Sequence, residues 1–140
     1  MTQLTPYLSF DGNCAEAMRF YERVLDGKLE ALLTNAQTPV AEHVPPGNED
    51  RIMHGYLTFG VTELMAGDAL VGTHKPMQGV SLALTYDKVE DARRVFDALG
   101  EGGTVTMPFE KAFWAEGFGM VVDRYGTNWI VNGGRIPFMG

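Results

Sequence analysis

Cysteine is almost absent from this sequence, which has only Cys14 among its 140 residues. A single cysteine excludes an intramolecular disulfide and a zinc site made of several thiolates, and it fits a reducing compartment, so we expect a cytoplasmic protein. Long apolar runs are missing as well, because no stretch approaches the roughly 20 residues that a membrane-spanning helix needs. Residues 1–10 lack the basic start and apolar run of a secretion signal. We therefore expect no membrane span and no secretion by signal peptide.

Positive charge is the second scarcity. The chain has 11 Lys and Arg against 18 Asp and Glu, a formal net charge of -7, and no basic cluster offsets it. Such a chain repels phosphate backbones and anionic lipid headgroups, so we expect neither nucleic acid nor a membrane as partner. The residues that are present, 45% hydrophobic and 21% charged, are ordinary for one globular domain.

A strand followed by a helix is indicated twice along the chain. Residues 4–10 alternate between apolar and other side chains, and residues 14–25 then place apolar side chains at helical spacing. Residues 80–86 and 89–99 repeat both patterns in the same order. This internal repeat predicts two modules of the same design.

Both helices also have predicted boundaries. A residue that can cap a helix precedes a glutamate by three positions at each start, which predicts capping boxes at Asn13–Glu16 and Asp87–Glu90. Glycine follows each helical stretch, at Gly27 and Gly100, and glycine is the usual residue just past a helix end. The helices should therefore run from about these caps to these glycines.

Three shorter β-like segments follow each helix, so each half consists of one strand, one helix and three strands. The predicted strands are residues 28–34, 52–59 and 63–66 in the first half, and 104–107, 119–123 and 128–132 in the second. Residues 35–50 should form a long loop and residues 69–78 a linker between repeats 1–68 and 79–140. We expect an α+β fold of paired βαβββ modules in a single domain, with helices on the outer face of a cupped mixed sheet.

Several stretches of the sequence resemble the PhnB-like branch of the vicinal oxygen chelate superfamily, which includes glyoxalases, bleomycin resistance proteins and dioxygenases. These stretches, in chain order, are residues 6–17, Phe20-Tyr21, residues 52–55, residues 105–108, Phe113-Trp114, residues 118–120 and residues 125–129. The resemblance implies the paired βαβββ fold and often a homodimer, but fold alone does not select an activity. Some PhnB-like proteins are described as ubiquinone-pathway methyltransferases, yet this sequence has no strand, glycine-rich loop and acidic residue of the kind that holds a methyl-donor nucleotide.

The resemblance also implies where a metal would be. Enzymes of the superfamily bind a divalent ion through His, Gln or Glu from the first and last strands of each module, because such a site needs three or four converging donors. The corresponding positions in this sequence are not good ligands; they are Thr5, Met65, Ser81 and Ile130. A slip of two residues brings in at most a weak oxygen site, from Tyr7, Glu63, Ala83 and either Asn128 or Asn132. We therefore expect no catalytic metal and no other cofactor.

The cupped face of the sheet should carry a mixture of polar and adaptable apolar side chains, which suits a small organic ligand. The candidate ligand-binding residues are Tyr7, His54, Tyr56, Glu63, Met65, Ser81, Trp114 and Asn132. A half-solvated sheet would show the same alternation, which is the alternative interpretation for each of them. His54 is the best single polar candidate, because the unperturbed imidazole pKa of about 6.5 suits proton transfer, although a strand histidine bonded to a neighbour is the commoner case. His43 and His74 lie in predicted loops and should be solvated.

Three other segments have two interpretations each. Residues 113–118 form a predicted turn in which Trp114 is either a pocket wall or part of a packed or intersubunit contact. Cys14 is either a reactive thiol at a helix start or a packed small residue. Residues 123–126 form a turn in which Gly126 supplies a positive φ, or else they present Arg124 to a substrate. The aromatic segment and the apolar tail, residues 136–139, favour a homodimer.

Three functions are consistent with these observations. The first is binding of a small organic molecule in the cup without a metal, with no assignment of substrate or catalysis. The second is a metal-dependent lyase or dioxygenase of the glyoxalase type. The third is a dimeric protein-association module in which the cup no longer binds anything.

Overall fold

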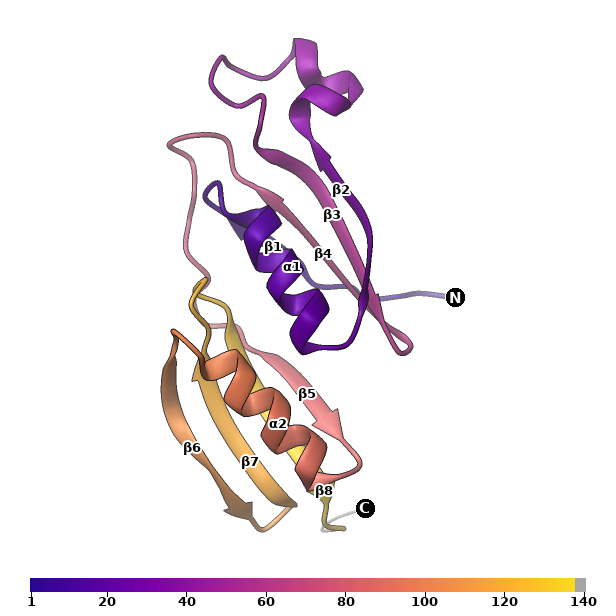
Figure 1. The fold of residues 1–140 in the computed structure, drawn as a ribbon, viewed down its shortest axis with the longest axis vertical. Coiled ribbons are helices and arrows are strands. Elements are labelled where there is room, and N and C mark those ends of the chain that lie inside the picture. Colours follow the sequence, from indigo (N-terminus) through magenta and orange to yellow (C-terminus); the bar gives the residue numbers. More distant parts are fainter. Residues whose placement is uncertain (138–140) are drawn as a thin grey trace. The chain divides into compact units, whose positions relative to one another are not determined.

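A computed structural model describes residues 1–137 and divides the chain into two compact units, Met1–Pro76 and the segment from Met77 onward. Each unit has one four-stranded sheet and one α-helix. The boundary falls within residues 69–78. In each unit, one helix covers one face of the sheet (Figure 1).

The first unit contains the first copy of the repeat. Its elements are β1 Tyr7–Phe10, α1 Cys14–Val24, β2 Lys28–Thr34, two short 3-10 helices at Asn35–Gln37 and Pro39–Glu42, β3 Ile52–Phe59 and β4 Thr62–Asp68. The strand order is β1-β4-β3-β2, in which β1 is parallel to β4 and the other neighbours are antiparallel.

The second unit has the same topology. Its elements are β5 Leu82–Tyr86, α2 Val89–Gly100, β6 Thr104–Ala112, β7 Ala115–Val122 and β8 Asn128–Arg135. The order is β5-β8-β7-β6, with β5 parallel to β8. The predicted repeat and the α+β class are therefore confirmed.

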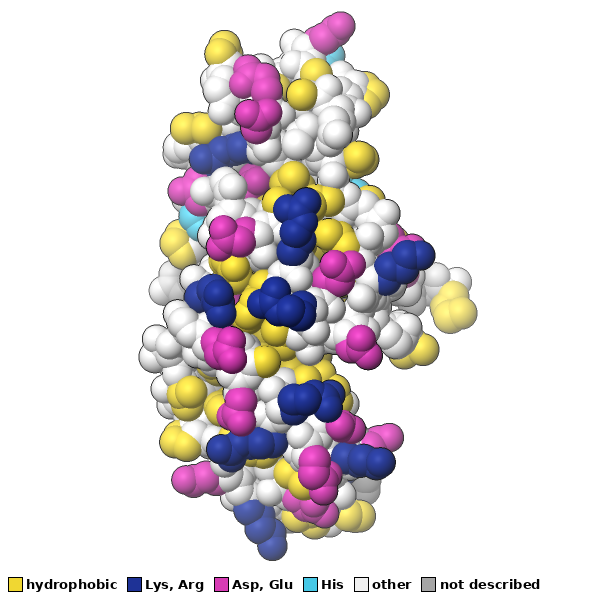
Figure 2. Space-filling model, viewed as in Figure 1, with side chains coloured by type: hydrophobic (Ala, Val, Ile, Leu, Met, Phe, Trp, Pro, Cys, Tyr) yellow, Lys and Arg dark blue, Asp and Glu magenta, His cyan; other side chains and the backbone are white. Residues whose placement is uncertain are grey.

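Each core lies between a helix and its own sheet. In the first unit, Met18 and Tyr21 of α1 are fully buried, and they share the core with Leu57 and Leu64 of the sheet. Burying one such side chain stabilises a fold by about 1.5–3 kcal/mol. The outer sides of both helices carry acidic and basic side chains in alternation (Figure 2), so one face of each helix is apolar and the other is solvated.

Glycines bring α2 close to its sheet. A Cβ on Gly133 of β8 would lie 2.4 Å from Ala92 Cβ, and one on Gly119 of β7 would lie 2.6 Å from the Phe96 ring. Both distances are shorter than carbon atoms can approach without displacement. The core of this unit is completed by Trp129, which is 2% exposed and donates its indole N–H to Asp123.

Both predicted capping boxes are wrong. Asn13 precedes α1, but its φ of -109° and ψ of 20° are not the extended conformation of a capping residue, and its side chain makes no capping bond. At α2 the N-cap is Lys88, one residue after the predicted Asp87. The amide groups at the start of α1 donate instead to Asp68, which is at least 54 residues away in the sequence, at the end of β4.

The segment 113–118 is also not the predicted turn. β6 continues to Ala112 and β7 begins at Ala115, so only Phe113 and Trp114 connect the two strands. Gly117 and Gly119 are strand residues of β7, and their lack of a side chain leaves room for Phe109 and Phe96. Phe138 and Met139 of the predicted apolar tail lie outside the described residues.

Residues 35–50 form a structured excursion from the sheet edge. Asn35 and Asn48 are buried, and the Asn35 side-chain amide donates to the Asn48 carbonyl at 2.8 Å. Thr34 N–H donates to the Gln37 side chain at 2.9 Å, the kind of bond that sequence reasoning expected at the α-helices. Within residues 1–137, no helix is both long and apolar enough to cross a membrane.

Candidate functional site

The face of the first sheet opposite α1 gathers five of the eight candidate residues. Strand alternation turns the buried residues toward α1 and leaves their neighbours on the other face. Met65 is paired with Tyr7 on one side and with Tyr56 on the other, and Glu63 is paired with Thr58. His54 lies two residues from Tyr56 on the same strand. This open face of the first sheet therefore brings together Tyr7, His54, Tyr56, Glu63 and Met65.

The three aromatic side chains of this face form a series. The His54 ring lies 6.4 Å from the Tyr7 ring and 6.4 Å from the Tyr56 ring, with interplanar angles of 25° and 15°. His54 is half-buried, and its ring nitrogens make no hydrogen bond to the residues that the structure describes. Of the two interpretations left open for His54, the hydrogen-bonded strand histidine is therefore not observed, and the imidazole nitrogens are available to a ligand.

Tyr7 is fitted to the sheet by a glycine. Its hydroxyl donates to the Met53 carbonyl at 3.2 Å, and a Cβ on Gly67 would lie 2.7 Å from the hydroxyl oxygen. Any larger residue at position 67 would displace the tyrosine. Burial of the hydroxyl raises the pKa of Tyr7, with a smaller contribution from Cys14, although the side chain as a whole is 55% exposed. The two observations agree because the hydroxyl is against the backbone while the ring faces outward.

Tyr56 and Glu63 form a short polar pair on neighbouring strands. The Tyr56 hydroxyl donates to Glu63 Oε1 at 2.6 Å. This hydrogen bond is the main cause of a raised pKa of Tyr56, and the charges of Glu63 and Glu30 add to it. The phenol therefore stays neutral, and the second oxygen of Glu63 can accept a hydrogen bond from a ligand.

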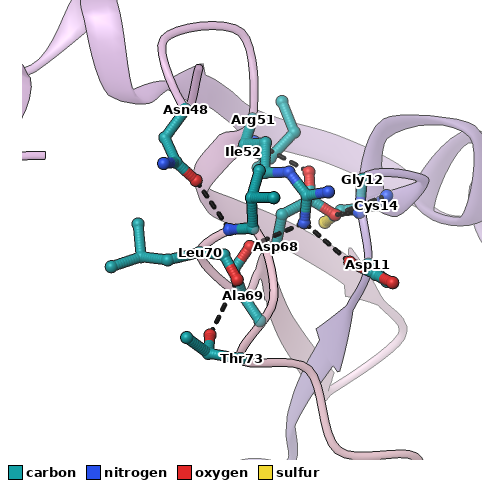
Figure 3. Close-up of polar contacts among 11 residues, drawn as sticks. Asp11, Gly12, Cys14, Asn48, Arg51, Ile52, Asp68, Ala69, Leu70 and Thr73 are labelled. Carbon is teal, nitrogen blue, oxygen red and sulfur yellow. Dashed lines mark hydrogen bonds and ion pairs between the residues drawn. The ribbon is translucent and has the colours of Figure 1, made fainter. Parts of the chain in front are cut away.

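A polar network fixes the ends of the strands that carry these residues (Figure 3). Asp68 Oδ1 accepts from the amides of Gly12 and Cys14 at 2.8 and 3.0 Å, and Oδ2 accepts from the amide of Ile52 at 2.8 Å. One carboxylate at the end of β4 therefore holds the start of α1 and the start of β3. Hydrogen bonds of this kind, with one charged partner, are about twice as strong as neutral ones.

Arg51 extends the network to the neighbouring loops. Its Nη1 bonds Asp11 Oδ1 at 2.9 Å and the Ala69 carbonyl at 2.8 Å. Asn48 Oδ1 accepts from the amide of Val71 at 2.8 Å, on the same side of the network (Figure 3). The loops after β1 and β4 are thus tied to the start of β3, the strand that carries His54.

The open face of the second sheet holds two further candidates. The Trp114 indole N–H donates to Asn132 Oδ1 at 3.1 Å, and Asn132 is paired with Phe118 and with Thr85. Ser81 is exposed and precedes β5, so the structure does not bring it to this sheet. Sequence reasoning missed Phe118 as a site residue, because it placed residues 113–118 in a turn.

Comparison with known proteins identifies the family. Residues 2–132 match the family described as 3-demethylubiquinone-9 3-methyltransferase. The chain belongs to this family, and a 25% identical protein of known structure whose name includes PhnB supports its PhnB-like character. The predicted resemblance is thereby confirmed.

Relatives match the PhnB-like chain over nearly its whole length. Protein YjdN of Escherichia coli is 34% identical over 137 residues, which are 92% of this chain and 93% of that one. The structure of PA1353 from Pseudomonas aeruginosa has a TM-score of 0.88 at 42% identity and covers 95% of this chain and 98% of its own. A Bacillus cereus structure titled as a putative 3-demethylubiquinone-9 3-methyltransferase, PhnB protein, has a TM-score of 0.78 at 25% identity, covering 94% and 99%.

A more distant structure shares the fold alone. The glyoxylase/bleomycin resistance protein/dioxygenase domain from Frankia has a TM-score of 0.69 at 11% identity and covers 99% of this chain and 96% of its own.

The strand register shows where the four predicted metal-ligand positions lie in this PhnB-like chain. Thr5 precedes β1, and Ser81 precedes β5. Met65 is paired with Tyr7, and Ile130 with Ala83, so the predicted alignment was displaced by two residues in β1 and β5. A phenol, a thioether and two alkyl groups are poor ligands for a divalent ion. No group of three or more His, Cys, Asp or Glu side chains gathers within residues 1–137, so these residues do not fit the metal of the superfamily.

Two other predicted candidates prove to be structural. Cys14 is completely buried, and burial raises the pKa of its thiol to about 12, with a smaller contribution from the charge of Asp68. The thiol is therefore packed and unreactive. Gly126 has a φ of 89°, which confirms the turn at residues 123–126, and Arg124 Nε donates to the Glu101 carbonyl at 3.0 Å.

The two remaining histidines have different surroundings. His43 is exposed, as predicted for a loop residue. His74 is only partly exposed, and its Nδ1 is buried without a hydrogen-bond partner among residues 1–137, so the expectation of a solvated side chain is wrong for it.

Proposed function

We propose that this PhnB-like protein binds a small, partly apolar organic molecule on the open face of the first sheet, without a catalytic metal. The observation that supports this function best is the series of nearly parallel rings of Tyr7, His54 and Tyr56. Aromatic rings that are already held in position offer apolar surface to a ligand and lose little conformational entropy when it binds. The Tyr56–Glu63 pair and the nitrogens of His54 then supply the polar contacts that orient a ligand.

The detail of this face argues for a site and against a merely solvated sheet. A solvated strand face does not require a glycine at position 67, whereas the Tyr7 hydroxyl occupies the space that a side chain there would take. Met65 is paired with Tyr7 on one neighbouring strand and with Tyr56 on the other, and it adds a flexible apolar surface between them. The bonds of Asp68 and Arg51 fix the end of β4 and the start of β3.

Methyl transfer, which the family description names, has less support from this geometry. In the first unit, the turn from β1 into α1 is where helix amides could bind an anionic group of a methyl-donor nucleotide. The amides of Gly12 and Cys14 there already bond Asp68. We therefore propose binding as the function and assign no transfer step.

Ligand binding can be tested with thermal shifts across a panel of small oxygenated and aromatic metabolites. A ligand of this face should raise the melting temperature of the natural protein. His54→Ala and Met65→Ala should abolish most of the shift, whereas His43→Ala, which changes an exposed loop histidine, should leave it intact. A shift that survives both face variants would place the ligand elsewhere.

Elemental analysis separates this function from the metal-dependent lyase or dioxygenase. Protein purified without added ions should contain far less than one divalent ion per chain. Stoichiometric metal that is lost in His54→Ala or Glu63→Ala would replace the binding proposal with the enzyme one. If no compound in the metabolite panel binds and the protein forms a stable dimer, the protein-association module would be favoured.

A further inference from the structure

We propose that the second unit has a binding site of its own for a small organic ammonium ion, formed by Phe113, Trp114 and Phe118 with Glu116. This site is argued from the second sheet alone and does not depend on the ligand of the first.

The three aromatic rings form a corner at one end of the second sheet. The Phe113 ring lies 4.6 Å from the Trp114 ring at 83°, and the Phe118 ring lies 5.0 Å from it at 71°. Rings that are nearly perpendicular present their faces in different directions, as adjoining walls do. The negative face of an aromatic ring attracts cations, and tryptophan is the strongest of the three aromatic residues in this respect.

Trp114 is held in place by one bond to β8 and one bond to the residue that follows β8. Its indole N–H donates to Asn132 Oδ1 at 3.1 Å, and its carbonyl accepts from the amide of Ile136 at 2.9 Å. The indole is therefore positioned before any ligand arrives. Phe113 remains 63% exposed.

Two carboxylates give this corner its charge preference. Glu116 lies across Gly134, where a Cβ would be 2.8 Å from its carboxyl carbon, and this places it on the same face as Phe118. Glu110 is paired with Phe118 from β6. Within residues 1–137 neither carboxylate forms an ion pair, with the adjacent Lys111 and Arg135 or with any other basic residue. Aromatic faces beside carboxylates that form no ion pair favour a cation over an anion or a neutral molecule.

Choline and its uncharged isostere 3,3-dimethylbutan-1-ol provide a matched pair of probes. The ionic strength is held constant with sodium chloride, and the two indole N–H resonances of the full chain are followed by NMR. Choline should shift the resonance of Trp114 with a dissociation constant on the order of 1 mM. Trp129, which is 2% exposed and bonded to Asp123, serves as the internal reference and should not shift. The neutral alcohol should bind about tenfold more weakly.

Variants distinguish the proposed site from a packed cluster or an interface. Glu116→Gln should weaken choline binding about fivefold, and Trp114→Leu, followed by the relaxation of the choline methyl signal, about tenfold or more. Glu101→Gln, an exposed acidic residue beside Arg124, is the control and should bind normally. Equal binding of the alcohol, or normal binding by Glu116→Gln, would overturn the proposal. So would a Trp114→Leu variant that changes only the oligomeric state.

Discussion

The Tyr56–Glu63 pair is the most specific polar feature of the open face of the first sheet. Glu63→Gln removes the negative charge that favours the neutral phenol, so the pKa of Tyr56 should fall toward its ordinary value of 10.0. The pKa can be measured from tyrosinate absorbance as the difference between each protein and its Tyr56→Phe counterpart. Glu116→Gln, in the second unit, should leave it unchanged. An unchanged titration in Glu63→Gln would mean that the pair does not persist in solution.

Cys14 makes the free energy of unfolding depend on pH in the alkaline range. Its pKa is raised from 9.0 to about 12 in the folded protein, so the unfolded chain ionises first. This contribution to the free energy of unfolding is complete below about pH 9 and is lost as pH rises toward 12. Urea unfolding across this range should show a steeper loss for the natural protein than for Cys14→Ala. Parallel pH profiles would contradict the assignment.

At the residue scale, alternation in the sequence was enough to place Tyr7, His54 and Tyr56 on one face. It could not show that Gly67 makes room for Tyr7, because that contact joins strands far apart in the sequence. Ser81 was misplaced because its strand begins one residue later. The partners of Glu63 and Trp114 depend on strand register, which periodicity does not specify.

Among the elements, α1 depends on a side chain that it does not contain. Asp68→Ala leaves the amides of Gly12, Cys14 and Ile52 without their acceptor, and should reduce the free energy of unfolding by about 3 kcal/mol. Asp68→Asn keeps one acceptor oxygen and should cost less. Urea denaturation measures both. Asp97→Asn, which removes only an exposed ion pair with Arg93, should cost about 0.5 kcal/mol or less.

The contact between α2 and its sheet depends on glycine. Gly133→Ala would place a Cβ 2.4 Å from Ala92, so we expect a loss of about 2 kcal/mol or more. Gly100→Ala is the matched control, because its Cβ would make only ordinary contacts, the nearest at 3.7 Å. Helix propensity should make that variant neutral or up to about 1 kcal/mol more stable. Equal effects of the two substitutions would contradict the close-packing argument.

The existence of both helices and their order among the strands could be predicted from periodicity. Their caps could not, because Asn13 and Asp87 match a local pattern while the acceptor for α1 comes from Asp68, distant in the chain. β7 was predicted too short for a related reason. Gly117 is typical of a turn by itself, and only the proximity of the Phe109 ring explains it in a strand.

For the whole molecule, we predict a homodimer, now on the basis of the edge strand β6. Val105 and Met107 of this strand are 47% and 44% exposed, and an edge strand offers unpaired backbone groups to a second copy. Sedimentation at micromolar concentration should show a dimer, and Met107→Lys should shift it toward monomer. Val61→Lys, at a fully solvated turn, should have no effect. A natural protein that sediments only as a monomer would refute this.

The division of the chain at Pro76 also affects how the protein is made. All four strands and the helix of the first sheet precede that residue, so every partner in its core has been synthesised before β5 begins. Domains tend to fold as units during synthesis, starting from the N-terminus. Asp68 is the last strand residue that this unit needs, and its synthesis allows α1 to receive its acceptor. The first unit can therefore close on the ribosome while the second is still being translated.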